Sequence, residues 1–125
     1  DAFHQSDLYL FCSIWDEPFS GGLLEALATG LPTIATTAGG TPEAIVSGEN
    51  GVLIAPDDPA ALAAAIASAM CEESSYTRMG IRAAVDVRQR WEFARYIDRL
   101  EAYYAAIVRG HSSEAPIDLR SVAVA

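Results

Sequence analysis

The chain has 125 residues, of which 51% are hydrophobic and 20% charged, and a formal net charge of −9. This composition is typical of one small soluble globular domain rather than a disordered chain. Acids dominate the first part, because Arg78 is the first cation and Lys does not occur. A nucleic-acid backbone is bound through Lys and Arg, so the composition argues against nucleic acid as a partner.

Neither a membrane span nor a disulfide framework is expected. The alanine-rich segment 59–71 is too short for a span, which needs about 20 apolar residues. Cys12 and Cys71 have no second Cys or His at ligand spacing, so we expect both to be small core residues in a reducing compartment. We therefore expect a cytoplasmic protein, or one that is peripheral at the inner face of the membrane.

Strand-like and helix-like segments alternate over the first 70 residues, which predicts an α/β fold with a parallel sheet and flanking helices. We expect strands over 7–12, 32–37 and 51–55, and helices over 21–29, 42–46 and 59–70. Asp58 and Pro59 predict the start of the last of these helices, because Asp caps helices and proline fits their first position. Asn50, between two glycines, predicts a turn with positive φ.

The later part of the chain predicts helices. Beyond Ser75 an apolar stripe recurs at helical spacing and consists of Tyr76, Met79, Ala83 and Val87. A further helix over 92–108 carries an aromatic stripe, a pattern that is far more often core than cofactor site. The periodicity ends after Gly110, so we expect residues 109–125 to form a loose tail.

The segment from Glu17 to Glu25 is the most informative part of the chain. It places two carboxylates around Gly21 and Gly22, between an apolar strand and a helix. The first N–H groups of a helix have no partner inside it and are available to phosphate oxygens. The glycines let a ligand approach the backbone. Glu25, about one turn further along, is placed to accept hydrogen bonds from hydroxyl groups such as those of a ribose. The pattern therefore predicts an anion site at the start of this helix.

Three ordered blocks resemble the group 1 (family four) retaining glycosyltransferases. Glu17 and Glu25 have the spacing of that family's paired glutamates, the sequence Gly-Gly-Thr-Pro-Glu over 39–43 matches a second block, and residues 48–66 match a third. The resemblance covers about residues 6–108. It implies the C-terminal, donor-binding lobe of a GT-B fold, built on a partial Rossmann-like sheet with a helical C-terminus. On this likeness residues 1–108 are the later part of that lobe, and the chain is a fragment of a longer enzyme.

The resemblance also implies residue roles. Glu17, the catalytic candidate, would contact hydroxyls of the donor sugar, and Glu25 would bind the ribose of a nucleotide-diphosphate sugar. Four backbone N–H groups would face the sugar and the diphosphate, those of Phe19, Ser20, Gly21 and Gly22. Enzymes of this kind are metal-independent, so no metal and no cofactor is expected. The partners would be the donor, an acceptor that the sequence does not identify, and the N-terminal lobe of the same enzyme.

The chain departs from the family pattern at several positions. Cys12 stands where proline is usual, and Ser20 and Gly21 replace the commoner glycine and bulky aliphatic residue. The Arg and Lys that hold the diphosphate in the family have no counterpart, and neither His4 nor His111 matches a family position. We therefore expect no transfer by this chain alone, and an isolated chain that is marginally stable or self-associates.

Other functions stay open at this point. A non-catalytic nucleotide-sugar-binding module would bind the diphosphate without transfer, and a glycoside hydrolase would use Glu17 and Glu25 as acid and nucleophile. A dinucleotide oxidoreductase fits less well, because no Gly-x-Gly-x-x-Gly follows a strand. In the simplest alternative both glutamates are surface acids. Asp57 and Asp58 resemble a metal pair, but helix capping explains Asp58 better.

Overall fold

The computed structural model describes residues 2–108. The chain divides into two compact units, Asp1–Arg88 and Gln89–Ala125. The first unit contains the sheet and the predicted site, and the second contains the last helix. The expected tail over 109–125 lies outside the described residues, and the assignment of 1–108 to one domain stays a prediction.

The sheet has three parallel strands in the order β1-β2-β3, which are β1 (Tyr9–Phe11), β2 (Thr33–Thr36) and β3 (Val52–Ile54). Tyr9 pairs with Thr33, and Ile34 pairs with Val52. All four residues of β2 are buried, whereas no residue of β1 or β3 is fully buried. The three strands occur where the apolar runs predict them, and the parallel pairing confirms the α/β fold class.

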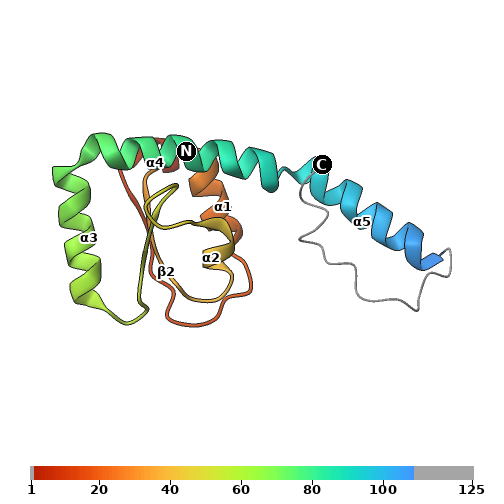
Figure 1. The fold of residues 1–125 in the computed structure, drawn as a ribbon, viewed down its shortest axis with the longest axis horizontal. Coiled ribbons are helices and arrows are strands. Elements are labelled where there is room, and N and C mark those ends of the chain that lie inside the picture. The colour runs from red at the N-terminus through yellow and green to blue at the C-terminus, as the bar shows by residue number, and fades with distance from the viewer. Residues whose placement is uncertain (1, 109–125) are drawn as a thin grey trace. The chain divides into compact units, whose positions relative to one another are not determined.

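Helices cover both faces of the sheet. These are α1 (Gly21–Ala28), α2 (Thr41–Ala44), α3 (Pro59–Cys71) and α4 (Glu73–Arg90), and a short 3-10 turn, η1 (Phe3–Gln5), precedes β1. Figure 1 shows α3 on one side of the sheet and α1 and α2 on the other, with α4 running across one end. Asp58 caps α3 as predicted, because its carboxylate accepts the N–H of Ala61 at 2.8 Å.

A core cluster joins the sheet to α3 and α4. Ile34, Ala65, Tyr76 and Met79 are buried together, with Leu62 and Ile66 among the side chains packed against them. The Tyr76 hydroxyl donates a hydrogen bond to the Ala65 carbonyl at 3.2 Å, which ties the two helices. The predicted stripe of α4 is confirmed, since all four of its residues are buried: Tyr76, Met79, Ala83 and Val87.

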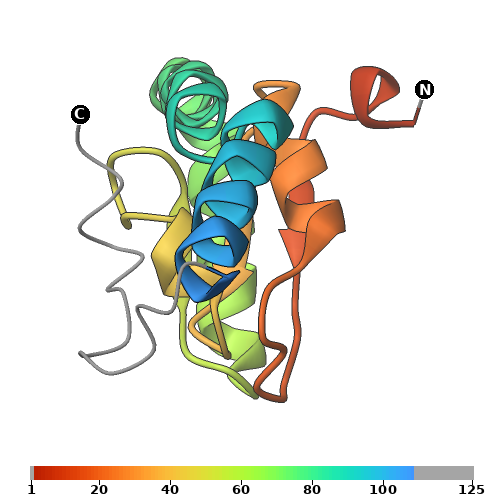
Figure 2. The same cartoon turned by 90° about the vertical axis from the view of Figure 1, so that its right-hand side faces the viewer.

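Helix α4 crosses the end of the sheet at which the strands begin. Its Gly80 lies so close to the turn before β2 that a Cβ there would overlap the Gly30 carbonyl oxygen and lie 3.1 Å from the nitrogen of Pro32. A larger residue would force the helix away from this turn. Loops occupy the opposite end of the sheet, where the strands finish. Figure 2 shows the connections after β1 and after β3 together at that end.

Asn50 anchors the turn before β3 through its side chain. It is buried, accepts the N–H of Val46 at 2.7 Å, and donates to the Ala44 carbonyl at 3.1 Å and to Asp86 of α4 at 3.0 Å. The prediction of positive φ at Asn50 is wrong, because Gly48 takes that conformation at +84°. The amide therefore serves as a hydrogen-bonding group that links the turn to α4.

The second unit contains α5 (Phe93–Val108), which confirms the helix predicted over 92–108. An ion pair of 3.9 Å joins Arg95 to Glu92 at its start. Its rings form two neighbouring pairs, Phe93 with Tyr96 at 6.3 Å and Tyr103 with Tyr104 at 5.9 Å between centroids. These four rings are exposed.

The expectation for the two cysteines is wrong, because Cys12 and Cys71 are both exposed. The strand β1 ends at Phe11, one residue before Cys12, so Cys12 belongs to the loop. Cys71 is the last residue of α3, beyond the part of that helix that packs on the sheet. Neither side chain therefore contributes to the core.

Candidate functional site

Two loops meet at the end of the sheet where β1 and β2 finish. The N–H of Gly40 donates to the carbonyl of Glu17 at 3.0 Å, and the N–H of Gly39 donates to the Asp16 carboxylate at 3.1 Å. The glutamate-bearing loop and the Gly-Gly block, which are more than 20 residues apart in sequence, are therefore in direct contact. This matches the rule that ligands of parallel sheets bind beyond the carboxyl ends of the strands.

The glycine pair is required by this contact. Gly39 has φ +54°, and a Cβ at Gly39 would overlap the Glu17 carbonyl oxygen and lie 2.7 Å from the Glu17 nitrogen. A Cβ at Gly40 would overlap the Pro18 carbonyl oxygen and lie 3.0 Å from the Phe19 ring. Because two backbones touch here, the position of Glu17 depends on the absence of both side chains.

Helix α1 begins directly after the glutamate-bearing loop. Ser20 is its N-cap, with the hydroxyl accepting the N–H of Leu23 at 3.3 Å. The N–H groups of Gly21 and Gly22, in the first turn, have no acceptor among residues 2–108. A Cβ at Gly21 would meet no atom within 4 Å, so there is open space beside this residue. We call this place, at Ser20, Gly21 and Gly22, the mouth of α1.

The two predicted carboxylates lie near this mouth. Glu25 is exposed and follows Gly22 by three residues on the helix, so the two positions share a face. Glu17 is half-buried in the preceding loop. Both carboxylates are close enough to the phenol of Tyr9 to act on its ionisation.

Tyr9, the first residue of β1, was not identified from the sequence. A Cβ on Gly22 would lie 3.7 Å from the Tyr9 hydroxyl oxygen, so the phenol reaches the mouth of α1. Burial raises the pKa of Tyr9 above its ordinary value of 10.0, and repulsion by the carboxylates of Glu17 and Glu25 raises it further. The alternation of side chains along β1 is the signal that could have found it, because it gives Tyr9 and Phe11 the same face.

The loop before Glu17 is held in a defined conformation. The Trp15 carbonyl accepts hydrogen bonds from the Ser13 hydroxyl at 3.1 Å and from the Glu17 N–H at 2.8 Å. The Thr36 hydroxyl, at the end of β2, donates to the Ser13 carbonyl at 2.6 Å. Trp15 itself is 77% exposed. The sequence did not reveal this exposed indole two residues from Glu17, which offers a fluorescent reporter for the site.

Three other candidate residues are Glu43, Asp58 and His4. Glu43 is exposed on α2, and the Asp58 side chain is engaged in capping α3. His4 lies at the amino ends of the strands, away from the mouth of α1. Within residues 2–108 no group of three His, Cys, Asp or Glu side chains is placed to hold a metal ion.

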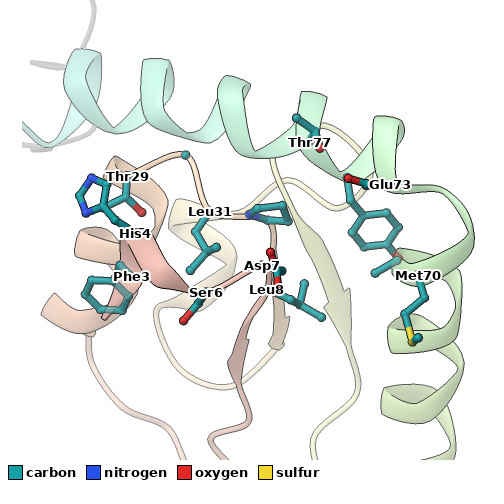
Figure 3. A pocket seen from close by; sticks show the side chains of 14 residues that line it. Phe3, His4, Ser6, Asp7, Leu8, Thr29, Leu31, Met70, Glu73 and Thr77 are labelled. Atoms are coloured by element: carbon teal, nitrogen blue, oxygen red, sulfur yellow. The ribbon is translucent and has the colours of Figure 1, made fainter. Parts of the chain in front are cut away.

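A cavity of about 570 Å³ occupies the opposite end of the sheet, beneath the start of α4 (Figure 3). Its walls come from η1, from the turn between α1 and β2, and from the junction of α3 and α4. None of the site residues predicted from the sequence lines it. The predicted site, at the other end of the sheet, is therefore separate from this cavity.

No helix in the described part of the chain is both long enough and apolar enough to cross a membrane.

The fold and the open carboxyl end place the chain among parallel, Rossmann-like α/β domains. Residues 1–86 match the family described as glycosyl transferases group 1. The chain belongs to this family, which confirms the resemblance found in the sequence. The D-inositol 3-phosphate glycosyltransferase of Corynebacterium diphtheriae is 34% identical over 90 residues, which cover 72% of this chain and 21% of that protein. A glycogen synthase of Mycobacterium tuberculosis is 31% identical over 113 residues, or 90% of this chain and 27% of that enzyme.

Solved structures agree with this assignment. Anabaena Alr3699/HepE in complex with UDP superimposes with a TM-score of 0.82 and 25% identity, over 84% of this chain and 29% of that one. The C-terminal domain of the group 1 glycosyl transferase LpcC from Francisella tularensis gives a TM-score of 0.68 and 26% identity, over 74% and 47% of the two chains. This confirms the C-terminal lobe of a GT-B fold. The chain spans about a quarter of the length of the curated relatives it matches.

Proposed function

We propose that this chain supplies part of the donor site of a retaining glycosyltransferase, which transfers a sugar from a nucleotide-diphosphate sugar to an acceptor. The diphosphate would lie at the mouth of α1, Glu25 would accept hydrogen bonds from the ribose, and Glu17 would contact the transferred sugar. Family membership supports the reaction class. The complex of the related HepE with UDP supports the ligand class.

One observation carries the proposal: two N–H groups without acceptors among residues 2–108 begin α1 beside open space at Gly21, with Glu17 before them and Glu25 after them in the chain. Those of Gly21 and Gly22 are donors for an anion, and the helix end adds a partial positive charge. The carboxylates of Glu17 and Glu25 only accept, so they fit hydroxyl groups. A nucleotide-diphosphate sugar has this order of groups, since its diphosphate lies between two hydroxyl-bearing rings.

Each group has its own part in the proposed transfer. When the bond from the anomeric carbon to the diphosphate breaks, negative charge grows on the diphosphate, and fixed N–H donors stabilise it. Glu17 would orient the sugar while this bond breaks, and its backbone is held in place by Gly40. These steps use amides and carboxylates, so we propose a metal-independent site without a cofactor. Phe19 and Ser20 stay candidates for further backbone contacts.

The experiment is a titration of the full chain with UDP, followed by NMR chemical shifts and, in a Trp91→Phe background that leaves Trp15 as the one indole, by fluorescence. Glu25→Gln should weaken binding about tenfold or more, because a hydrogen bond to a charged group is worth about 1.5–3 kcal/mol. The matched control is Glu49→Gln, which removes the same charge from an exposed turn and should bind as the wild type does.

Three outcomes would contradict the proposal. Equal binding of UDP by the wild type and by Glu25→Gln would show that this carboxylate does not bind the ribose. Saturation by inorganic pyrophosphate at the same concentration as UDP would show that the nucleoside is not recognised. An intact protein that binds UDP-glucose but never releases UDP in the presence of acceptors would be a binding module instead of an enzyme.

A further inference from the structure

Tyr9 is held by aromatic contacts that fix the direction of its ring. The Phe3 ring meets it edge-on, at 5.7 Å between centroids and 83° between planes. The Phe11 ring, on the same face of β1, stacks at 6.5 Å and 23°. Such pairs stabilise a defined ring orientation. The hydroxyl is thus directed by its surroundings rather than by a hydrogen bond of its own.

The hydroxyl group of Tyr9 is an unused donor at the mouth of α1. It lies beside Gly22, 3.7 Å from the place of a Cβ there, and the capping hydroxyl of Ser20 lies 3.9 Å from the same point. Ser20 already accepts the N–H of Leu23. Among residues 2–108 the Tyr9 hydroxyl has no hydrogen-bond partner, although the residue is half-buried. Among residues 2–108 no buried side-chain oxygen or nitrogen lacks a partner, so the Tyr9 hydroxyl is open to solvent and a ligand oxygen can reach it.

The surroundings of Tyr9 fix the role of its hydroxyl as a hydrogen-bond donor. Burial and the two nearby carboxylates keep the phenol protonated, since both raise its pKa. The phenol O–H and the Gly22 N–H are then two neighbouring donors. Neighbouring donors fit a phosphate oxygen, whereas a sugar hydroxyl is better held by an acceptor such as Glu25.

We infer that the Tyr9 hydroxyl donates a hydrogen bond to a phosphate oxygen of the bound nucleoside diphosphate, beside the N–H of Gly22, and so contributes to the recognition of the diphosphate. The inference rests on the proposed function. It supplies a neutral donor in a region where residues 2–77 carry no Lys or Arg. Tyr9 is a binding residue in this account, because its oxygen touches the ligand.

The test compares two probes, UDP and uridine, on three forms of the full chain. Tyr9→Phe removes only the hydroxyl and keeps the ring contacts with Phe3 and Phe11. Tyr104→Phe makes the same deletion at an exposed position of α5 and is the matched control. NMR shift titrations up to millimolar ligand measure weak as well as strong binding, and unfolding curves of the three forms show that each is folded.

Tyr9→Phe should lose about tenfold of its affinity for UDP and less than twofold for uridine, because the lost hydrogen bond is made to a charged group. Tyr104→Phe should bind both probes as the wild type does. Wild-type affinity of Tyr9→Phe for UDP would overturn the inference, and so would an equal loss for UDP and uridine, which would mean that Tyr9 only shapes the mouth. If the proposed function is wrong, Glu25→Gln will bind UDP as tightly as the wild type does. This result is distinct from any result for Tyr9→Phe.

Discussion

Replacing Gly39 with alanine tests whether the contact between the two loops positions the site. Gly39 has φ +54°, a conformation that costs a residue with a Cβ about 1–2 kcal/mol. The new Cβ would also overlap the Glu17 carbonyl oxygen, and overpacking of this kind costs about 1–3 kcal/mol. The expected loss in the free energy of unfolding is therefore about 2–5 kcal/mol, a large part of the stability of a small domain.

Gly48→Ala is the control that separates the two contributions. Gly48 also has positive φ, at +84°, but a Cβ there would meet no atom within 4 Å. Gly48→Ala should therefore lose only the conformational part, about 1–2 kcal/mol. Urea unfolding followed by circular dichroism measures both variants, and the difference between them reports the clash with Glu17.

Binding of UDP provides a second measurement on the same variants. Gly39→Ala pushes the Glu17 backbone away and weakens the hydrogen bond from the Gly40 N–H, so its UDP affinity should fall. Gly48 lies in the turn before β3, and its variant should bind as the wild type does. Equal losses of stability in the two variants, or unchanged binding in Gly39→Ala, would refute the argument that this contact sets the position of Glu17.

Two further predictions concern stability. Asp58→Ala removes the cap of α3, where the carboxylate accepts the Ala61 N–H, and should cost about 1 kcal/mol in urea unfolding while UDP binding stays unchanged; an unaltered unfolding midpoint would contradict the capping role. The folded pKa of Tyr9 lies above the unfolded value near 10.0, so in the window between them the unfolded chain releases the phenol proton while the folded chain keeps it. Stability should therefore fall as pH rises above 10.0, and this fall should be smaller in Tyr9→Phe; the same alkaline fall in both forms would show that Tyr9 titrates as it does in the unfolded chain.

The sequence predicts those features that depend on residues close together in the chain. The cap at Asp58 and the stripe of α4 depend on residues three or four positions apart, and both are confirmed. The strands occur where the apolar runs predict them, but each is shorter than its run. Because β1 ends one residue earlier than predicted, Cys12 lies in a loop and not in the core.

The sequence does not predict the contacts between segments that are far apart in the chain. Nothing near Asn50 indicates that its amide binds Asp86 of α4, and nothing near Gly80 indicates that it meets the Gly30 carbonyl. From the sequence, Tyr9 is only one residue of the strand predicted over 7–12, because the role of its hydroxyl depends on where α1 begins in space. These features arise from the packing of α1 and α4, which a single sequence does not reveal.

On the proposed function, the order of donors and acceptors at the mouth of α1 would decide its ligand more than the net charge of −9 does. At physiological salt, exposed charges are screened beyond about 8 Å, whereas hydrogen bonds act at about 3 Å. A nucleic acid presents phosphates along its whole length and needs many cations, which the first 77 residues lack. One diphosphate needs only a few donors at one place, and in our proposal Gly21, Gly22 and Tyr9 would provide them between two acceptors. The same acidic composition thus argues against nucleic acid while it remains compatible with a nucleoside diphosphate.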